Sequence, residues 1–117
     1  MKRNTAQLKE QLIQTGIDEI GKHGIEQLSL RTVAKACGVT HGSPYRHFES
    51  KEGYLKVVLT QLSLFLNQEI NENIDATGSA RDQLTRLGLN FIIFAKTYPH
   101  FFEALFIKFP FKYMKVT

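Results

Sequence analysis

Apolar residues recur at helical spacing along almost the entire chain, and the alternation typical of a β-strand is nearly absent. In the first segment they form one stripe along a helix that we predict from about Thr5 to Lys22, with Gly21 and Gly24 ending it. The stripe consists of Leu8, Leu12, Ile13, Gly16, Ile17 and Ile20. The spacing therefore predicts an all-α fold in which the helices bury their apolar faces against one another.

Two short helices separated by a glycine are predicted next. Ser29 is a good N-cap for the first, and Gly38 would end it. Its buried face would consist of Leu30, Val33, Ala34 and Cys37. Thr40 can cap the second short helix, which we expect to run to His47.

These two helices, packed under the longer first one, would form a helix-turn-helix. Small Ala34 permits close approach of the helices, Gly38 permits the turn, and Val39 would fill the gap between them. The arrangement is typical of DNA-binding proteins, although the same pattern also occurs in helical hairpins that bind no DNA.

The rest of the chain predicts three more helices. Ser50 would cap a long amphipathic helix that runs to about Glu72, and residues 75–79 would form a loop. Another helix is expected over residues 80–97, and Pro99 would begin a further one that runs to about Lys108. The apolar faces of the two longer helices would contain Tyr54, Leu55, Val58, Leu62, Phe65, Leu66, Ile70, Leu84, Leu87, Phe91 and Phe94.

The length and composition suit one ordinary domain, or a small domain with part of a second. The chain has 117 residues, of which 43% are apolar and 22% are charged, as in a globular protein. No signal-peptide core follows the N-terminus, and the apolar tract from Phe91 to Phe111 is too interrupted for a membrane span. A single cysteine, Cys37, makes no intrachain disulfide, which suggests the cytoplasm.

The basic charge is concentrated in the first half. Residues 1–51 contain eight Lys and Arg residues against five Asp and Glu residues, whereas residues 52–117 contain seven against six. A basic bias suggests an anionic partner such as nucleic acid, although a merely basic surface explains the charge equally well.

The stretch from Gly38 to Glu52 resembles the DNA-binding head of the tetracycline-repressor (TetR) family. The family signature requires an apolar residue and a Ser or Thr after the first glycine, a second glycine, and then fixed aromatic, His, Lys and Glu positions. Every fixed position is met here, by Gly38, Val39, Thr40, Gly42, Tyr45, His47, Phe48, Lys51 and Glu52. The resemblance is specific through about Val58 and weaker beyond it.

The resemblance implies that the second short helix enters the major groove of DNA. At its N-terminal end Thr40, His41 and Ser43 offer donors and acceptors to base edges, and Gly42 allows the backbone to approach closely. Arg46 suits guanine, whereas Tyr45, His47 and Lys51 suit phosphates. The full candidate set is Ser29, Arg31, Thr40, His41, Gly42, Ser43, Tyr45, Arg46, His47 and Lys51.

Two positions in this stretch have structural interpretations. Phe48 is expected to pack in the core. Pro44, at the fourth position of the predicted helix, removes a backbone donor and disfavours helical geometry at Ser43. We therefore expect this helix to begin with a tight or irregular turn.

Nothing in the sequence supports catalysis. His41 and His47 lack a nearby nucleophile with an orienting acid, and one cysteine with separated histidines makes no zinc site. We expect no enzyme, no cofactor and no metal site.

Aromatic residues are concentrated near the C-terminus, where nine of the thirteen lie between Phe91 and Tyr113. They would form one wall of an apolar ligand pocket, as the resemblance implies, or else an ordinary core or dimer surface. The candidate pocket residues are Leu62, Phe65, Leu66, Leu87, Phe91, Phe94 and Phe102. The family usually has several more helices, so the pocket and the main dimer contacts would be incomplete in this chain.

We therefore predict a DNA-binding domain over residues 5–54 and a partial ligand-binding and dimerisation domain over residues 55–117. The resemblance implies a repressor that binds a palindromic operator on double-stranded DNA as a homodimer and releases it when a small apolar or amphipathic effector binds. The alternative is a small helical module that binds a protein or a membrane surface through its aromatic residues and has no DNA-binding activity.

Overall fold

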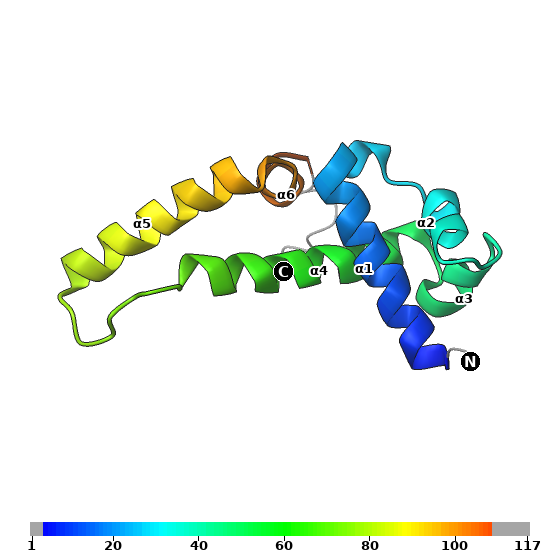
Figure 1. Ribbon diagram of the computed structural model, residues 1–117, viewed down its shortest axis with the longest axis horizontal. Coiled ribbons are helices and arrows are strands. Elements are labelled where there is room, and N and C mark those ends of the chain that lie inside the picture. Colours follow the sequence, from blue (N-terminus) through cyan, green and yellow to red (C-terminus); the bar gives the residue numbers. More distant parts are fainter. Residues whose placement is uncertain (1–3, 109–117) are drawn as a thin grey trace.

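The computed structural model describes residues 4–108, and these residues form helices connected by short turns and one longer loop (Figure 1). The helices are α1 (Thr5–His23), α2 (Leu30–Ala36), α3 (Ser43–Phe48), α4 (Lys51–Ile70), α5 (Ala80–Thr97) and α6 (Pro99–Glu103). A 3-10 turn, η1 (Ile25–Gln27), follows α1, and a π-helical segment, η2 (Ala104–Lys108), follows α6. No strand occurs between residues 4 and 108, so the predicted all-α fold is confirmed. Three of the aromatic residues expected to form a pocket wall or an ordinary core or dimer surface lie outside the described residues; these are Phe109, Phe111 and Tyr113.

Side-chain caps determine where four of the helices begin. Asn4 and Gln7 form a reciprocal capping box at α1, in which each side chain accepts a hydrogen bond from the other residue's backbone N–H. Ser29 caps α2 and Ser50 caps α4, as predicted, and Ser79 caps α5. Because a cap acts over only three residues, these starts could be predicted from sequence.

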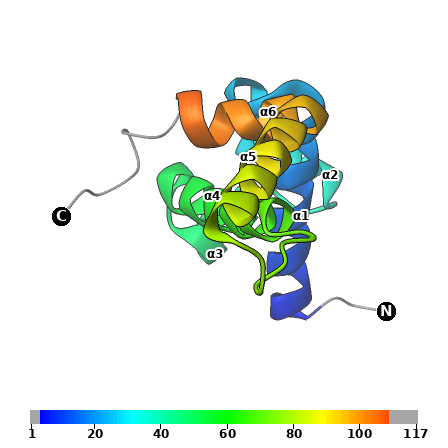
Figure 2. The same ribbon diagram turned by 90° about the vertical axis from the view of Figure 1, so that its left-hand side faces the viewer.

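Helices α1, α2 and α3 form a head at one end of the molecule, as Figure 1 shows. Helix α4 leaves the head, and α5 returns beside it, so that Figure 2 views the pair almost end-on. Asn90 on α5 links this helix to the C-terminal end of α4, because its side-chain amide donates hydrogen bonds to the backbone carbonyls of Ile70 and Glu72. The molecule measures 52 × 34 × 29 Å. None of the helices within residues 4–108 is both long enough and apolar enough to cross a membrane.

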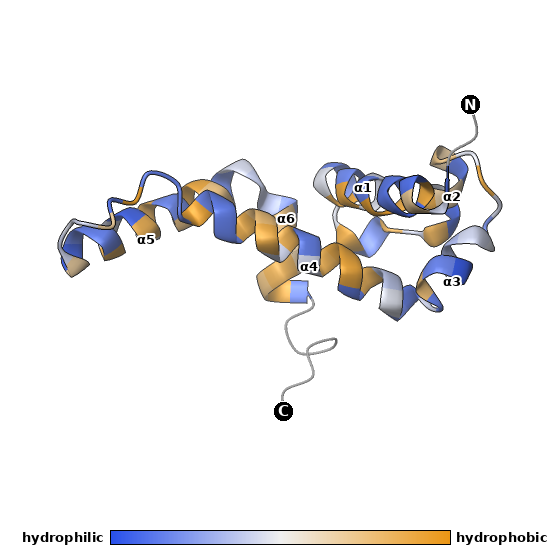
Figure 3. Cartoon of the chain, turned by 90° about the horizontal axis from the view of Figure 1, so that it is seen from below, coloured by the Kyte–Doolittle hydropathy of each residue, from blue (hydrophilic) through white to orange (hydrophobic). Residues whose placement is uncertain are grey.

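One apolar core joins the head to α4 and to residues 101–105. Its buried members come from α1, η1, α2, α3, α4 and η2 and include Leu12, Ile20, Val33, Tyr54, Val58 and Ala104. Figure 3 shows apolar residues gathered where α4, α5 and α6 meet. Ala104 is fully buried in this core even though the predicted head ends at residue 54. That boundary also falls inside the continuous helix α4, and the division at residue 54 stays a prediction.

The C-terminal segment is held against the far end of α1. Phe101 of α6 packs on Gly21, and His100 packs on Gly24. Lys108 of η2 forms an ion pair with Glu26 of η1, with 2.6 Å between the ammonium nitrogen and the carboxylate oxygen. Residues 99–108 therefore cover a part of the head for which the sequence predicted no covering segment.

Candidate nucleic-acid interface

The turn between α2 and α3 depends on Gly38. Its φ angle is +72°, in the left-handed region that favours glycine. The N–H of Gly38 donates to the Lys35 carbonyl at 3.1 Å, and the N–H of Val39 donates to the Ala34 carbonyl at 3.0 Å. These bonds satisfy the last carbonyls of α2 and turn Val39 back onto the core. The predicted role of Gly38 is confirmed.

Helix α3 begins later than the sequence suggested. It spans Ser43–Phe48, with Gly42 at the N-cap and no side-chain cap, so the prediction that Thr40 caps it is wrong. Thr40 instead accepts the N–H of Ser43 through its backbone carbonyl, at 3.0 Å. This later start places Pro44 in the first turn. Backbone N–H groups there have no hydrogen-bond partner within the helix, so the N–H that proline lacks is not needed. Pro44 is therefore the second residue of α3, at a position where a helix accepts proline.

The two sides of α3 have opposite surroundings. Pro44 and Phe48 face the core, and Phe48 is only 7% exposed, as predicted. Ser43 is also largely buried, at 4% exposed, so it offers much less surface to a partner than the exposed residues of α3 do. Tyr45, by contrast, is 47% exposed, and Arg46 is exposed beside it. Helix α3 is therefore buried on one side, and on the other side it exposes the phenol of Tyr45 and the guanidinium of Arg46.

A tight corner connects α3 to α4 and positions Lys51. Glu49 has a φ angle of +69°, and its N–H donates to the Tyr45 carbonyl at 2.8 Å. Ser50 then caps α4 by accepting the N–H of Gly53 at 3.0 Å. A side chain at Gly53 would collide with the Phe48 carbonyl, so the corner requires glycine there. Lys51 thus becomes the first residue of α4, at the positive end of a 20-residue helix.

The remaining candidate residues occupy four neighbouring segments of the head. Arg31 is exposed in the first turn of α2, Thr40, His41 and Gly42 are exposed before α3, and His47 is half-buried in α3. Ser29 is half-buried, and its hydroxyl oxygen accepts the N–H of Thr32, so its observed role is to cap α2.

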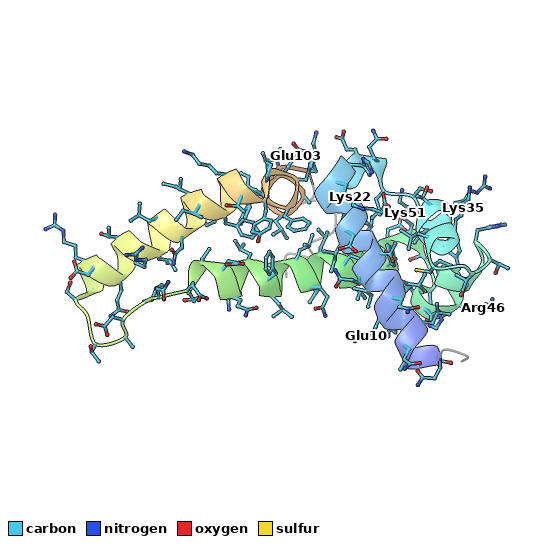
Figure 4. All side chains as sticks on the ribbon, viewed as in Figure 1. Glu10, Lys22, Lys35, Arg46, Lys51 and Glu103 are labelled. Carbon is cyan, nitrogen blue, oxygen red and sulfur yellow. The ribbon has the colours of Figure 1, made fainter. Side chains whose placement is uncertain are left out.

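Arg31, Arg46 and Lys51 are exposed and have no carboxylate partner among residues 4–108. Within residues 4–108 the ion pairs join Glu19 to His23 and Glu26 to Lys108, so neither includes Arg31, Arg46 or Lys51. Figure 4 shows the side chains of Lys35 and Arg46 at the same end of the molecule. This end therefore offers free positive charge to an anionic partner.

One exposed cation beside α3 was not among the predicted residues. The ammonium of Lys9, on α1, lies 5.8 Å from the centroid of the Phe48 ring on α3. Nothing in the local pattern connects residues 9 and 48, because their proximity depends on how α1 crosses α3.

The aromatic residues of the predicted ligand pocket are divided between two packed groups. Phe65 contacts Phe94, Tyr98 and Phe101, with ring centroids between 5.1 and 6.2 Å apart; we call these four residues the inner aromatic cluster. Phe91 contacts Phe102 and Phe106, which form the outer aromatic cluster. Tyr98 and Phe101 belong to the aromatic stretch that was predicted to form one wall of the pocket, although they are not among the seven candidate residues.

Other members of the predicted pocket set are buried or partly buried. Leu62 and Phe94 are at most 2% exposed, and Leu66 and Leu87 are half-buried. A groove of about 230 Å³ lies at the edge of the α4–α5 pair, and Phe94 is the member of the predicted set that lines it.

Three comparisons place the head among known proteins. Residues 12–58 match the family described as bacterial regulatory proteins, tetR family. The chain is similar to the probable acrEF/envCD operon repressor of Escherichia coli K12, with 36% identity over 50 residues that cover 43% of this chain and 23% of that protein. It is also similar to the HTH-type transcriptional repressor KstR2 of Mycolicibacterium smegmatis, with 28% identity over 82 residues that cover 70% of this chain and 40% of that protein.

The fold agrees with that of a larger solved structure. The match is a TetR-family transcriptional regulator from Haemophilus influenzae, with a TM-score of 0.63 and 21% identity, and it covers 89% of this chain and 57% of the other. The chain spans less than half the length of the two curated relatives described above. The structural likeness therefore extends beyond the head to the helices that follow it.

Proposed function

Because this chain belongs to the tetR family of bacterial regulatory proteins through residues 12–58, we propose that it is a sequence-specific DNA-binding transcriptional regulator. The observation that carries the proposal is the two-sided burial of α3. Pro44 and Phe48 anchor this helix, whereas Tyr45 and Arg46 extend into solvent. A short helix with a fixed inner face and a polar outer face has the form needed to enter a major groove.

The exposed residues suit two kinds of DNA contact. Arg46 has the fork of donors that reads guanine O6 and N7, and Thr40 and His41 precede it at the N-terminal end of the recognition segment. Lys51 combines its ammonium with the positive end of α4, and this combination favours a phosphate oxygen. Phosphate binding would hold the head in place, while Arg46 would select the sequence.

Four other candidates complete the proposed surface. Tyr45 and His47 would donate to phosphates on either side of Arg46, and Arg31 would reach the same backbone from the start of α2. Gly42 is exposed, and a Cβ there would meet nothing within 4 Å, so this stretch of backbone is free to approach DNA closely.

The test is binding to duplexes selected from a random pool, measured by fluorescence anisotropy over a series of salt concentrations. The wild-type affinity should fall steeply with salt because each phosphate contact releases counterions. Lys51→Ala should weaken binding to all duplexes about equally and reduce the salt slope by about one unit. Lys96→Ala, a change of an exposed lysine on α5, is the control and should leave the slope unchanged. Binding that does not depend on salt would contradict the proposal.

We further propose that the regulator is an effector-controlled repressor that acts as a homodimer in the cytoplasm. Two similar proteins are described as repressors, which supports this direction of control. A dimer would place two heads about 34–36 Å apart, on successive major grooves of a palindromic operator. The effector would be a small apolar or amphipathic molecule bound next to Phe65, Phe91 and Phe94. If so, operator DNA should reduce effector affinity by the same factor by which the effector reduces DNA affinity.

One observation favours the alternative of a protein-interaction module. Helix α5 exposes several large apolar side chains: Leu84, Leu89, Ile92 and Ile93 are each between 47% and 69% exposed. Surfaces of this kind commonly associate with another apolar surface. A pure interaction module predicts no salt-dependent DNA binding, and no effect of substitutions at Tyr45 or Arg46, so the same experiment separates the two functions.

A further inference from the structure

A contact between two helices places Lys9 beside α3, the helix that carries the proposed DNA contacts. It lies one turn into α1, and its ammonium lies over the ring of Phe48, the last residue of α3, at 5.8 Å from the centroid. A cation over the face of an aromatic ring is attracted by the negative charge density of that face. The ring therefore holds the lysine side chain beside α3 before any ligand arrives.

The surroundings of Lys9 keep its charge free. Lys9 is exposed and takes no part in the ion pairs found within residues 4–108. The first turn of α1 contains no acidic residue, so the positive end of this 19-residue helix is not neutralised. The adjacent carboxylate, Glu10, lines a groove together with Gln61 of α4, and Figure 4 shows Glu10 away from Arg46.

The neighbours of the Phe48 ring are proposed DNA contacts. The His47 ring lies 6.0 Å from the Phe48 ring, and Lys51 begins α4 three residues after Phe48. Lys9 therefore adds a cation from α1 to the cations that α3 and α4 already present. The two strands of a duplex border the major groove on both sides. If α3 lies in that groove, a helix beside α3 can reach the sugar-phosphate backbone.

We propose that Lys9 is an additional phosphate-binding residue, preorganised by the ring of Phe48; this inference rests on the proposed DNA-binding function. The ring contact restricts the flexible lysine stem in advance, and it leaves the three N–H donors of the ammonium free for a phosphate oxygen. The contact would be independent of base sequence and would stabilise every complex that the head forms.

The test compares four variants on one selected duplex over a salt series. Lys9→Met retains an apolar stem over Phe48 but removes the charge, Lys9→Arg retains the charge, and Lys9→Ala removes both. Lys22→Ala is the matched control, because Lys22 is an exposed lysine in the last turn of the same helix, beside α6. Thermal unfolding followed by circular dichroism reports on each variant's fold.

The proposal predicts that Lys9→Met and Lys9→Ala both lose about one unit of salt slope and about five- to tenfold in affinity near 0.1 M salt. Lys9→Arg and Lys22→Ala should bind like the wild type. If Lys9→Met retains wild-type binding while Lys9→Ala does not, Lys9 acts only through packing and the proposal is overturned. A wild-type chain that binds no duplex overturns the proposed function as well, whereas wild-type binding with an unchanged slope in Lys9→Met overturns this inference alone.

Discussion

The hydroxyl of Tyr54 in α4 donates a hydrogen bond to the backbone carbonyl of Leu12 in α1, at 2.6 Å. Tyr54 is fully buried, and Gly16 lies directly against its hydroxyl with no room for a side chain. This polar contact inside an otherwise apolar core determines how closely α1 and α4 approach. The head and the long helix that leaves it are therefore joined at a defined position.

The contact predicts coupled effects of Gly16→Ala and Tyr54→Phe. Gly16→Ala should destabilise the fold by about 1–3 kcal/mol, because the new methyl group collides with the Tyr54 hydroxyl. Tyr54→Phe should cost about 1 kcal/mol through the lost hydrogen bond. The double variant should cost less than the sum, since the phenylalanine makes room for the methyl group. Urea unfolding of the four proteins measures the coupling, and strictly additive costs would show that the two residues do not interact.

Tyr54 also predicts loss of stability at alkaline pH. Burial raises the pKa of Tyr54 above its ordinary value, an effect to which the nearby Cys37 contributes. The unfolded chain releases the phenolic proton near pH 10 while the folded chain retains it, so this contribution is complete below about pH 10 and is lost as pH rises further. Stability of the wild type should fall more steeply above pH 10 than that of Tyr54→Phe, by up to about 1.4 kcal/mol per pH unit. Unfolding midpoints at pH 8, 10 and 11 test this, and parallel curves would contradict it.

Glycine substitutions should have opposite effects at two helical positions. A Cβ at Gly53 would collide with the Phe48 carbonyl, which is backbone and cannot move aside, so Gly53→Ala should cost about 1–3 kcal/mol or more. A Cβ at Gly88 would meet nothing within 4 Å, so Gly88→Ala should stabilise exposed α5 by about 0.5–1 kcal/mol. Thermal unfolding should show melting temperatures shifted in opposite directions. Equal shifts would mean that the α3–α4 corner adjusts freely.

Arg46→Ala should change which sequences the head prefers. Arg46 is exposed on the outer side of α3, where a bidentate contact with guanine is worth about 1–3 kcal/mol of discrimination. Affinity should fall by that amount for duplexes with one particular base pair and change little when that pair is replaced. Binding measured on a panel of single-pair variants of the selected duplex tests the prediction. A uniform loss across the panel would assign Arg46 to a phosphate.

Helix α3 begins later than its local sequence pattern predicts, because burial outweighs the preference for a particular N-cap residue. Thr40 has the side chain of a good N-cap, yet the helix begins at Ser43 because Pro44 fits only the first turn and because burial of Ser43, Pro44 and Phe48 fixes the orientation of this helix. Local cap preference differs by about 1 kcal/mol among residues, which is less than the burial of a proline and a phenylalanine contributes. Packing of these residues in the core therefore determines where α3 begins.

The sequence by itself determined the helical elements, most of their starts and the identity of the head, because these depend on interactions within a few residues. Ser29, Gly38 and Ser50 act on backbone groups three or four positions away, so their roles could be predicted. Only the tertiary structure decided that Ala104 completes the head core and that Lys9 lies over Phe48. A helical apolar stripe shows that a face must be covered, but the segment that covers it depends on the path of the chain between distant helices.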